Sequence, residues 1–283
     1  MANAEDIVSR FYNTVGWESE GEITEDARRW EDLREHATEY VSRCRLRVLR
    51  HIPSSGSRIL DMASGPIQYD EYLEFSRNFE KRYCVDLSTT ALEKAKKRIG
   101  DHGVFLKGSF FDLPMEESFF DCAISLHTIY HMDRDRQEEA VRKLIHVTRP
   151  GKPVVIVYAN PDTLVSRVRG RINRVRRNLG ALRRRGRMHR QTAASAATIE
   201  PRDEEETMYF FAHPLEWWKR FEDVARVKIF PWRAFDADTQ KQLIPNNSIG
   251  RGIFDLLFKL EERFPDFFAR HFEYPIIVLT RNS

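Results

Sequence analysis

Cysteine is scarce in this sequence, and long hydrophobic runs are missing from it. The chain of 283 residues has three cysteines, Cys44, Cys84 and Cys122, and their spacing fits neither a disulfide framework nor a metal site. No apolar run approaches the roughly 18 residues of a membrane-spanning helix. The first residues are polar and acidic, unlike a secretory signal. These absences favour a protein of the reducing cytoplasm.

The composition is that of a folded protein. Hydrophobic residues make up 41% of the chain, aromatic residues 12% and charged residues 31%. These values exclude a disordered chain, a collagen-like chain and a disulfide-rich miniprotein. The length fits one domain with accessory segments.

Positive charge is concentrated in one segment. Residues 162–190 hold eleven arginines and one acid, a net charge of +10, and no lysine. Since the whole chain carries +3, the remainder carries −7. Apolar residues recur in this segment at intervals of four and three, which predicts one apolar stripe if the segment is helical: Val168, Ile172, Val175, Leu179 and Leu182.

Short apolar segments alternate with helical patterns from residue 58 onward. The strands are expected at 58–63, 81–86, 104–108, 120–126 and 154–158, with helices at 69–79, 89–99 and 135–147 between them. Two more strands, 225–230 and 275–280, follow a helix at 215–223 and enclose an apolar helix at 249–264. We expect Ile253, Leu256, Leu257 and Leu260 to share one face of that helix.

This alternation predicts an α/β fold with a Rossmann-like, mostly parallel sheet and helices on both faces. A helical segment precedes the sheet, and helical insertions are expected before and after the sixth strand. The expected division is an N-terminal helical lid (1–56), a cofactor-binding core (57–161), an arginine-rich insertion (162–208) and the rest of the core with an acceptor-site insertion (209–283).

Glycine is nearly absent where a dinucleotide site would need it. The first strand leads into Ala63, Gly65 and Ile67, which leaves one glycine of three at the positions of a pyrophosphate-binding turn. The second strand ends at Asp86, where a carboxylate can accept hydrogen bonds from a ribose. The pattern therefore favours a nucleoside without phosphates over a nicotinamide dinucleotide. The alternative role of Asp86 is to cap the following helix.

Four segments together resemble the class I S-adenosylmethionine-dependent methyltransferases. They are ILDMASGP (59–66), YCVDLS (83–88), KGSFFDLP (107–114) and FDCAISLHTIYHM (120–132). The resemblance implies the cofactor S-adenosyl-L-methionine. Where the family commonly has an acid after the glycine of the third segment, this chain has Ser109, with Asp112 three residues later.

The resemblance also implies roles for single residues. Asp61, Ala63 and Gly65 would hold the methionine end, and Asp86 would bind the ribose. Around the adenine it places Leu87, Phe110 and either Ser109 or Asp112, and it gives the Leu126 carbonyl to the amino group of the cofactor. Tyr12 is a candidate for closing over the cofactor. Phe110 has a purely structural alternative as a core residue.

Three residues after the fourth strand are candidates for catalysis. His127, Tyr130 and His131 cluster where an acceptor should enter, and histidine suits proton removal near neutral pH. The alternative for each histidine is a hydrogen bond to the loop backbone. No metal site is expected.

The acceptor is the least determined part of the function. We expect methyl transfer to a hydroxyl or amine of a small molecule or a glycan, including a lipid-linked one, by a cytoplasmic enzyme. Residues 163–190 could hold it peripherally at an anionic membrane surface on the inner face. The alternatives are an RNA methyltransferase that uses this segment, with nucleic acid the less favoured partner, and a cofactor-binding module without catalysis.

Overall fold

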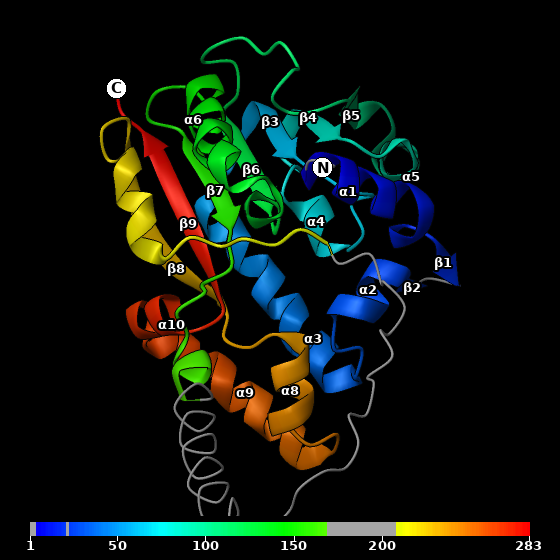
Figure 1. Ribbon diagram of the computed structural model, residues 1–283, viewed down its shortest axis with the longest axis vertical. Coiled ribbons are helices and arrows are strands. Elements are labelled where there is room, and N and C mark those ends of the chain that lie inside the picture. Colours follow the sequence, from blue (N-terminus) through cyan, green and yellow to red (C-terminus); the bar gives the residue numbers. More distant parts are fainter. Residues whose placement is uncertain (1–3, 21–22, 169–207) are drawn as a thin grey trace, which may run out of the picture.

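The core of the protein is a seven-stranded sheet (Figure 1). The structure is a computed structural model, and it describes residues 4–20, 23–168 and 208–283. The strand order is β5-β4-β3-β6-β7-β9-β8. Neighbours are parallel from β5 to β7, whereas β9 runs antiparallel to both β7 and β8. The strands are β3 (Gly56–Met62), β4 (Phe79–Asp86), β5 (Gly103–Lys107), β6 (Cys122–Leu126), β7 (Pro153–Val157), β8 (Ala225–Arg233) and β9 (Tyr274–Arg281). The predicted Rossmann-like sheet is confirmed.

Helices cover both faces of this sheet because alternate strand residues point to opposite sides. Leu60 and Met62 face a cluster with α6 (Gln137–Val147) and the 3-10 helix Leu215–Phe221. Ile59 faces the other side, toward the 3-10 helix Leu46–His51. On that side α5 (Thr89–Ile99) packs Leu92 and Ala95 on Cys84 of β4.

The N-terminal segment is helical, as predicted, but it is divided into short elements. These are α1 (Ala4–Phe11), a π-helical turn Tyr12–Gly16, the hairpin β1 (Ser19–Glu20) and β2 (Ile23–Thr24), α2 (Glu25–Trp30) and α3 (Glu35–Arg45). The break between α2 and α3 forms at Asp32, whose carboxylate accepts hydrogen bonds from the backbone and the guanidinium of Arg34. Asp32 thereby competes with the helical backbone.

The insertion after β8 consists of α8 (Ala237–Leu243), α9 (Ser248–Arg263) and α10 (Pro265–His271). The predicted helix is present, but the predicted face was wrong. Phe254, Leu257 and Glu261 are buried, whereas Leu256 is 57% exposed and Ile253 and Leu260 are each 37% exposed. The rotation follows from Glu261, which has buried polar partners on other elements.

Two predicted helices before β7 are shorter than expected. The pattern at 69–79 gives only α4 (Glu71–Glu74), because Phe79 already pairs with Gly56 in the sheet. The α-helix expected from Asp135 starts at Gln137, after a 3-10 turn. The expected strands deviate only by one to three residues at their ends.

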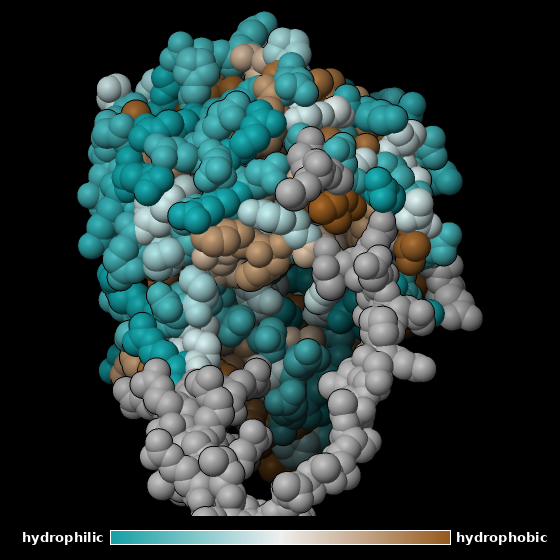
Figure 2. Space-filling view, viewed as in Figure 1, coloured by the Kyte–Doolittle hydropathy of each residue, from teal (hydrophilic) through white to brown (hydrophobic). Residues whose placement is uncertain are grey.

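The arginine-rich insertion is described only at its start, where residues 164–168 are helical. Residues 169–207, which carry most of the predicted apolar stripe and the candidate membrane or RNA contacts, lie outside the described part of the chain. Within the described part, none of the helices has both the length and the apolar character needed to cross a membrane. The face in Figure 2 is mostly hydrophilic, with hydrophobic side chains gathered near its middle.

Candidate active site

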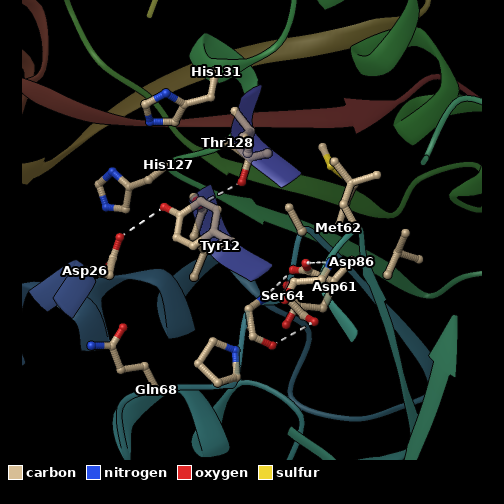
Figure 3. Close-up of a pocket in the computed structure, with 18 of the residues that line it drawn as sticks. Tyr12, Asp26, Asp61, Met62, Ser64, Gln68, Asp86, His127, Thr128 and His131 are labelled. Carbon is tan, nitrogen blue, oxygen red and sulfur yellow. Dashed lines mark hydrogen bonds between the residues drawn. The ribbon is translucent and has the colours of Figure 1, made fainter. Parts of the chain in front are cut away.

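A cavity of about 440 Å³ lies at the carboxyl ends of the parallel strands. Ligands of open α/β sheets bind at this edge, and the volume is that of a small-molecule pocket. Figure 3 shows part of its wall. Eleven of the thirteen predicted site residues line it: Tyr12, Asp61, Ala63, Gly65, Asp86, Leu87, Phe110, Leu126, His127, Tyr130 and His131. The two others, Ser109 and Asp112, are absent from the wall.

The loop after β3 has an unusual backbone. Ala63, Gly65 and Ile67 all have positive φ, at 57°, 55° and 54°. Glycine adopts this region without strain, whereas a residue with a Cβ does not. All three positions of the turn therefore have a backbone conformation that favours glycine, although two of the three residues are not glycine.

Asp61 is held by Arg82 of the neighbouring strand. The Arg82 Nε lies 3.0 Å from Oδ2 of Asp61, and both side chains are buried. Burial raises the pKa of Asp61, while the Arg82 charge and hydrogen bond oppose the rise. The predicted ligand of the methionine end is thus also half of a buried ion pair beneath the loop.

Asp86 ends β4 and fixes the same loop. One carboxylate oxygen accepts the Gly65 N–H at 2.8 Å, and the other accepts the Ser88 N–H at 2.8 Å. Burial raises the pKa of Asp86 to about 6, against these backbone hydrogen bonds. Each oxygen retains acceptor capacity, which is what binding of two ribose hydroxyls requires. The cap of the following helix is Ser88, whose hydroxyl accepts the Ala91 N–H.

The N-terminal elements form the roof of the cavity. Tyr12 stacks on Trp17 with 4.7 Å between the ring centroids, and a Cβ placed on Gly65 would lie 3.2 Å from the Trp17 ring. The loop between β3 and α4, residues 63–70, is called the cofactor loop below. The Thr24 hydroxyl accepts a hydrogen bond from Gln68 of this loop at 2.6 Å. Tyr12 lies between Asp86 and His127 in the view of Figure 3.

Asp26 of α2 is a wall residue that sequence reasoning missed. Its carboxylate accepts the Tyr12 hydroxyl at 3.0 Å (Figure 3). Burial raises the pKa of Asp26 to about 7, although the Tyr12 hydrogen bond lowers it. A carboxyl group with a pKa near neutrality can take up or release a proton under working conditions. Its sequence context, an ordinary acidic first turn of a helix, gave no signal of this.

His127 follows β6 and is enclosed by aromatic rings. Its Nδ1 lies 2.9 Å from the Tyr130 hydroxyl, and its ring centroid lies 4.5 Å from that of Trp232 and 5.3 Å from that of Tyr274. Burial, and then the charge of Arg233, hold the pKa of His127 well below its usual range. His127 is therefore neutral at neutral pH. Its backbone is in the left-handed region, with φ at 58°.

His131 has one defined tautomer. Its Nδ1 lies 2.7 Å from the Tyr209 carbonyl oxygen, which can only accept, so Nδ1 carries the proton. The Nε2 atom is then an unprotonated acceptor. Burial lowers the pKa of His131 to about 4. The backbone hydrogen bond considered as an alternative is present, and it leaves Nε2 available as a base.

The residues predicted to surround an adenine ring are only partly brought to the cavity. Phe110 lines the cavity, but the Ser109 hydroxyl donates to Glu5 of α1 at 2.8 Å, and Asp112 is exposed. Glu5 itself lines the cavity, so an N-terminal helix brings a carboxylate to its wall. The predicted Leu126 carbonyl accepts the Thr128 hydroxyl at 3.0 Å.

Arg233 is a further wall residue that the sequence did not point out. It is the last residue of β8, at the carboxyl edge of the sheet, and its place there was the available signal. Asp133 accepts the backbone N–H of Ala4 at 3.2 Å, so it ties α1 to the loop after β6.

Comparison with known proteins finds a match for the core of the sheet. Residues 60–156 match the family model of a methyltransferase domain. This range holds all four motif segments except Ile59. A search of curated proteins finds no match.

Solved structures share the fold at low sequence identity. A SAM-dependent methyltransferase from Archaeoglobus fulgidus is 15% identical with a TM-score of 0.51, over 86% of this chain and 94% of that one. Magnesium protoporphyrin IX methyltransferase from Synechocystis with bound SAM is 10% identical with a TM-score of 0.54, over 100% and 99%. Phosphoethanolamine N-methyltransferase 1 from Haemonchus contortus is 10% identical with a TM-score of 0.58, over 100% of this chain and 50% of that one. At these identities the similarity concerns the fold.

Proposed function

We propose that this chain is a class I S-adenosylmethionine-dependent methyltransferase whose acceptor is a hydroxyl or amine of a small molecule or glycan; the match of residues 60–156 to a methyltransferase domain supports it. The observation that supports the proposal is that one cavity has two chemically different ends. Asp86 and the left-handed loop stand at one end, and a mostly aromatic region with His127 and His131 stands at the other. An aromatic region within a cavity of about 440 Å³ suits a small acceptor group.

The residues at the first end fit the cofactor. The buried Asp86 carboxylate can accept hydroxyl hydrogen bonds, Phe110 and Leu87 supply apolar wall, and Glu5 offers an acceptor for an amino group. S-adenosyl-L-methionine supplies an activated methyl group for in-line transfer when it is bound. The chain's own contribution is therefore mainly positioning.

At the other end, His131 is the residue best arranged to take a proton from an acceptor hydroxyl. Its Nδ1–H is fixed on the Tyr209 carbonyl, which directs the lone pair of Nε2 away from that carbonyl. His127 and Tyr130 hydrogen-bond to each other, so we assign them to holding the acceptor. An amine acceptor would need only to be neutral for transfer.

Calorimetric titration with S-adenosylhomocysteine tests the cofactor site. We expect micromolar binding, at least a tenfold loss in Asp86→Ala, and no comparable affinity for NADH. Asp112→Ala is the matched control, because this carboxylate is exposed and outside the cavity. Affinity should also weaken as the pH falls through about 6, where Asp86 takes up a proton. Equal affinity of Asp86→Ala and the intact protein would contradict the site.

The pH dependence of turnover separates the two candidate bases. With a hydroxyl acceptor found by a labelled-methyl screen, and with S-adenosyl-L-methionine kept saturating at every pH, a His131 base predicts that kcat/KM for the acceptor stays level as the pH falls until about 4. An Asp26 base predicts a decline already below about 7. His131→Ala should lower kcat and leave the affinity for S-adenosylhomocysteine unchanged. An equal loss of kcat and of affinity for S-adenosylhomocysteine would contradict a catalytic role of His131.

A further inference from the structure

Arg233 is a buried cation at the acceptor end of the cavity. Because β7 and β8 each run antiparallel to β9, they run in the same direction, and Arg233 lies at the carboxyl edge with the cavity. The side chain lines the cavity, and the residue is only 5% exposed. A charge in such a position is costly unless it is paired.

The acidic groups of the wall have partners of their own. Asp26 accepts from Tyr12, Asp61 pairs with Arg82, and Glu31 pairs with Arg45 at 2.6 Å. Glu5 and Asp86 are bound by Ser109 and by backbone N–H groups. In the described ranges no carboxylate forms an ion pair with Arg233, and its Nε and Nη1 atoms have no hydrogen-bond partner.

Aromatic rings hold the guanidinium in place. Its carbon lies 5.0 Å from the centroid of the Trp232 ring and 4.9 Å from that of Tyr274. Such contacts offset only part of the desolvation of a charge. The Tyr274 side chain also hydrogen-bonds to the guanidinium. The Nε and Nη1 donors keep no partner, and the planar guanidinium matches the two oxygens of a carboxylate or a phosphate.

The same rings connect this cation to the reaction region. Trp232 and Tyr274 both pack against His127, with ring centroids 4.5 and 5.3 Å from that of the imidazole. An anionic group on Arg233 would thus belong to the acceptor.

We propose that Arg233 binds an oxyanion group, a carboxylate or a phosphate, of the acceptor; this rests on the proposed function. Arg233 is then the residue that selects anionic acceptors and places them beside His127. A carboxylate and a phosphate share the recognition chemistry and are distinguished by the test.

The test uses aromatic probes of similar shape and different charge. Benzoate, phenyl phosphate and the neutral benzamide are titrated into the full chain, with and without saturating S-adenosylhomocysteine. We expect at least tenfold tighter binding of one or both anions than of benzamide, and the tighter anion identifies the group. Arg233→Met should abolish this preference. The control Arg226→Met removes a positive charge from an exposed position of β8 and should retain the preference for anions.

The melting temperature of the ligand-free variants supplies a second readout. Removal of an unpaired buried charge should leave the Tm of Arg233→Met equal to or above that of the intact protein. A lower Tm, or an anion preference that survives in Arg233→Met, would overturn the proposal, as would no preference in the intact protein. Failure of S-adenosylhomocysteine to bind would instead refute the proposed function, because the probes are also titrated without it.

Discussion

Ala63, Gly65 and Ile67 share a left-handed backbone but differ in what their side chains contribute. A residue with a Cβ loses roughly 1–2 kcal/mol in this region. Ile67 regains this through burial, since it is fully enclosed with Cys84, Leu92 and Ala95. Ala63 is only partly buried and has a single methyl group to bury. The strain is therefore compensated at Ile67 and largely uncompensated at Ala63.

Substitution by glycine should separate these two cases. Ala63→Gly is expected to raise the free energy of unfolding by about 0.5 kcal/mol, because the relief of backbone strain exceeds the conformational entropy that glycine loses on folding. Ile67→Gly should lower it by at least about 2 kcal/mol through lost burial. Urea denaturation measures both. Ala95→Gly, inside α5, is the control and should cost about 1 kcal/mol. Destabilisation by Ala63→Gly of that size would show that the strain is absent.

At the scale of elements, Thr24 couples α2 to the cofactor loop. Its hydroxyl accepts the Ala27 N–H as the helix cap and also the Gln68 amide. The roof of the cavity therefore depends on the start of one short helix. Asp236 caps α8 in the same way, through the Thr239 N–H, but its helix lies in the insertion rather than in the roof.

The two caps should differ in their effect on the cofactor. Thr24→Ala and Asp236→Ala should each lower the free energy of unfolding by about 1 kcal/mol. Only Thr24→Ala should also weaken binding of S-adenosylhomocysteine, because Gln68 loses its anchor. Calorimetry on both variants checks this. A similar loss of affinity in Asp236→Ala would mean that affinity follows global stability and not the roof.

At the scale of the whole molecule, Glu261 joins parts far apart in the sequence. Its carboxylate binds Arg47 at 2.8 Å, the Tyr40 hydroxyl at 2.6 Å and the Ala234 N–H at 2.9 Å. The N-terminal helices, the end of β8 and the insertion thus meet on one buried group. Figure 1 shows α3 and α9 side by side below the sheet.

Neutralising Glu261 should therefore affect the entire fold. Glu261→Gln leaves Arg47 buried without its full counter-charge and should lower the free energy of unfolding by about 3–5 kcal/mol. Glu262→Gln is the neighbouring control: this partly exposed side chain pairs with the buried Arg47 and the exposed Arg50, and its loss should cost less because Arg47 keeps the buried Glu261 as its counter-charge. Equal effects in thermal or urea unfolding would contradict the central role of Glu261.

The sheet and the cofactor loop were predictable because their signals are local. Apolar strands are contiguous in the sequence, and Gly65 and Asp86 stand directly at strand ends. The orientation of α9 was not predictable, since Glu261 is positioned by Arg47, 214 residues away. Likewise Asp26 and Glu5 enter the cavity through the folding of the N-terminal segment over the sheet edge, which no local pattern encodes.

The position of Arg233 beside His127 has a consequence for proton balance. The guanidinium charge is, after burial, the main cause of the lowered pKa of His127. An anion that neutralises this charge raises the proton affinity of the imidazole, and by reciprocity a protonated imidazole strengthens binding of the anion. Occupation of the acceptor end by an anion and uptake of a proton by His127 are thus linked equilibria over the pH range in which this imidazole titrates.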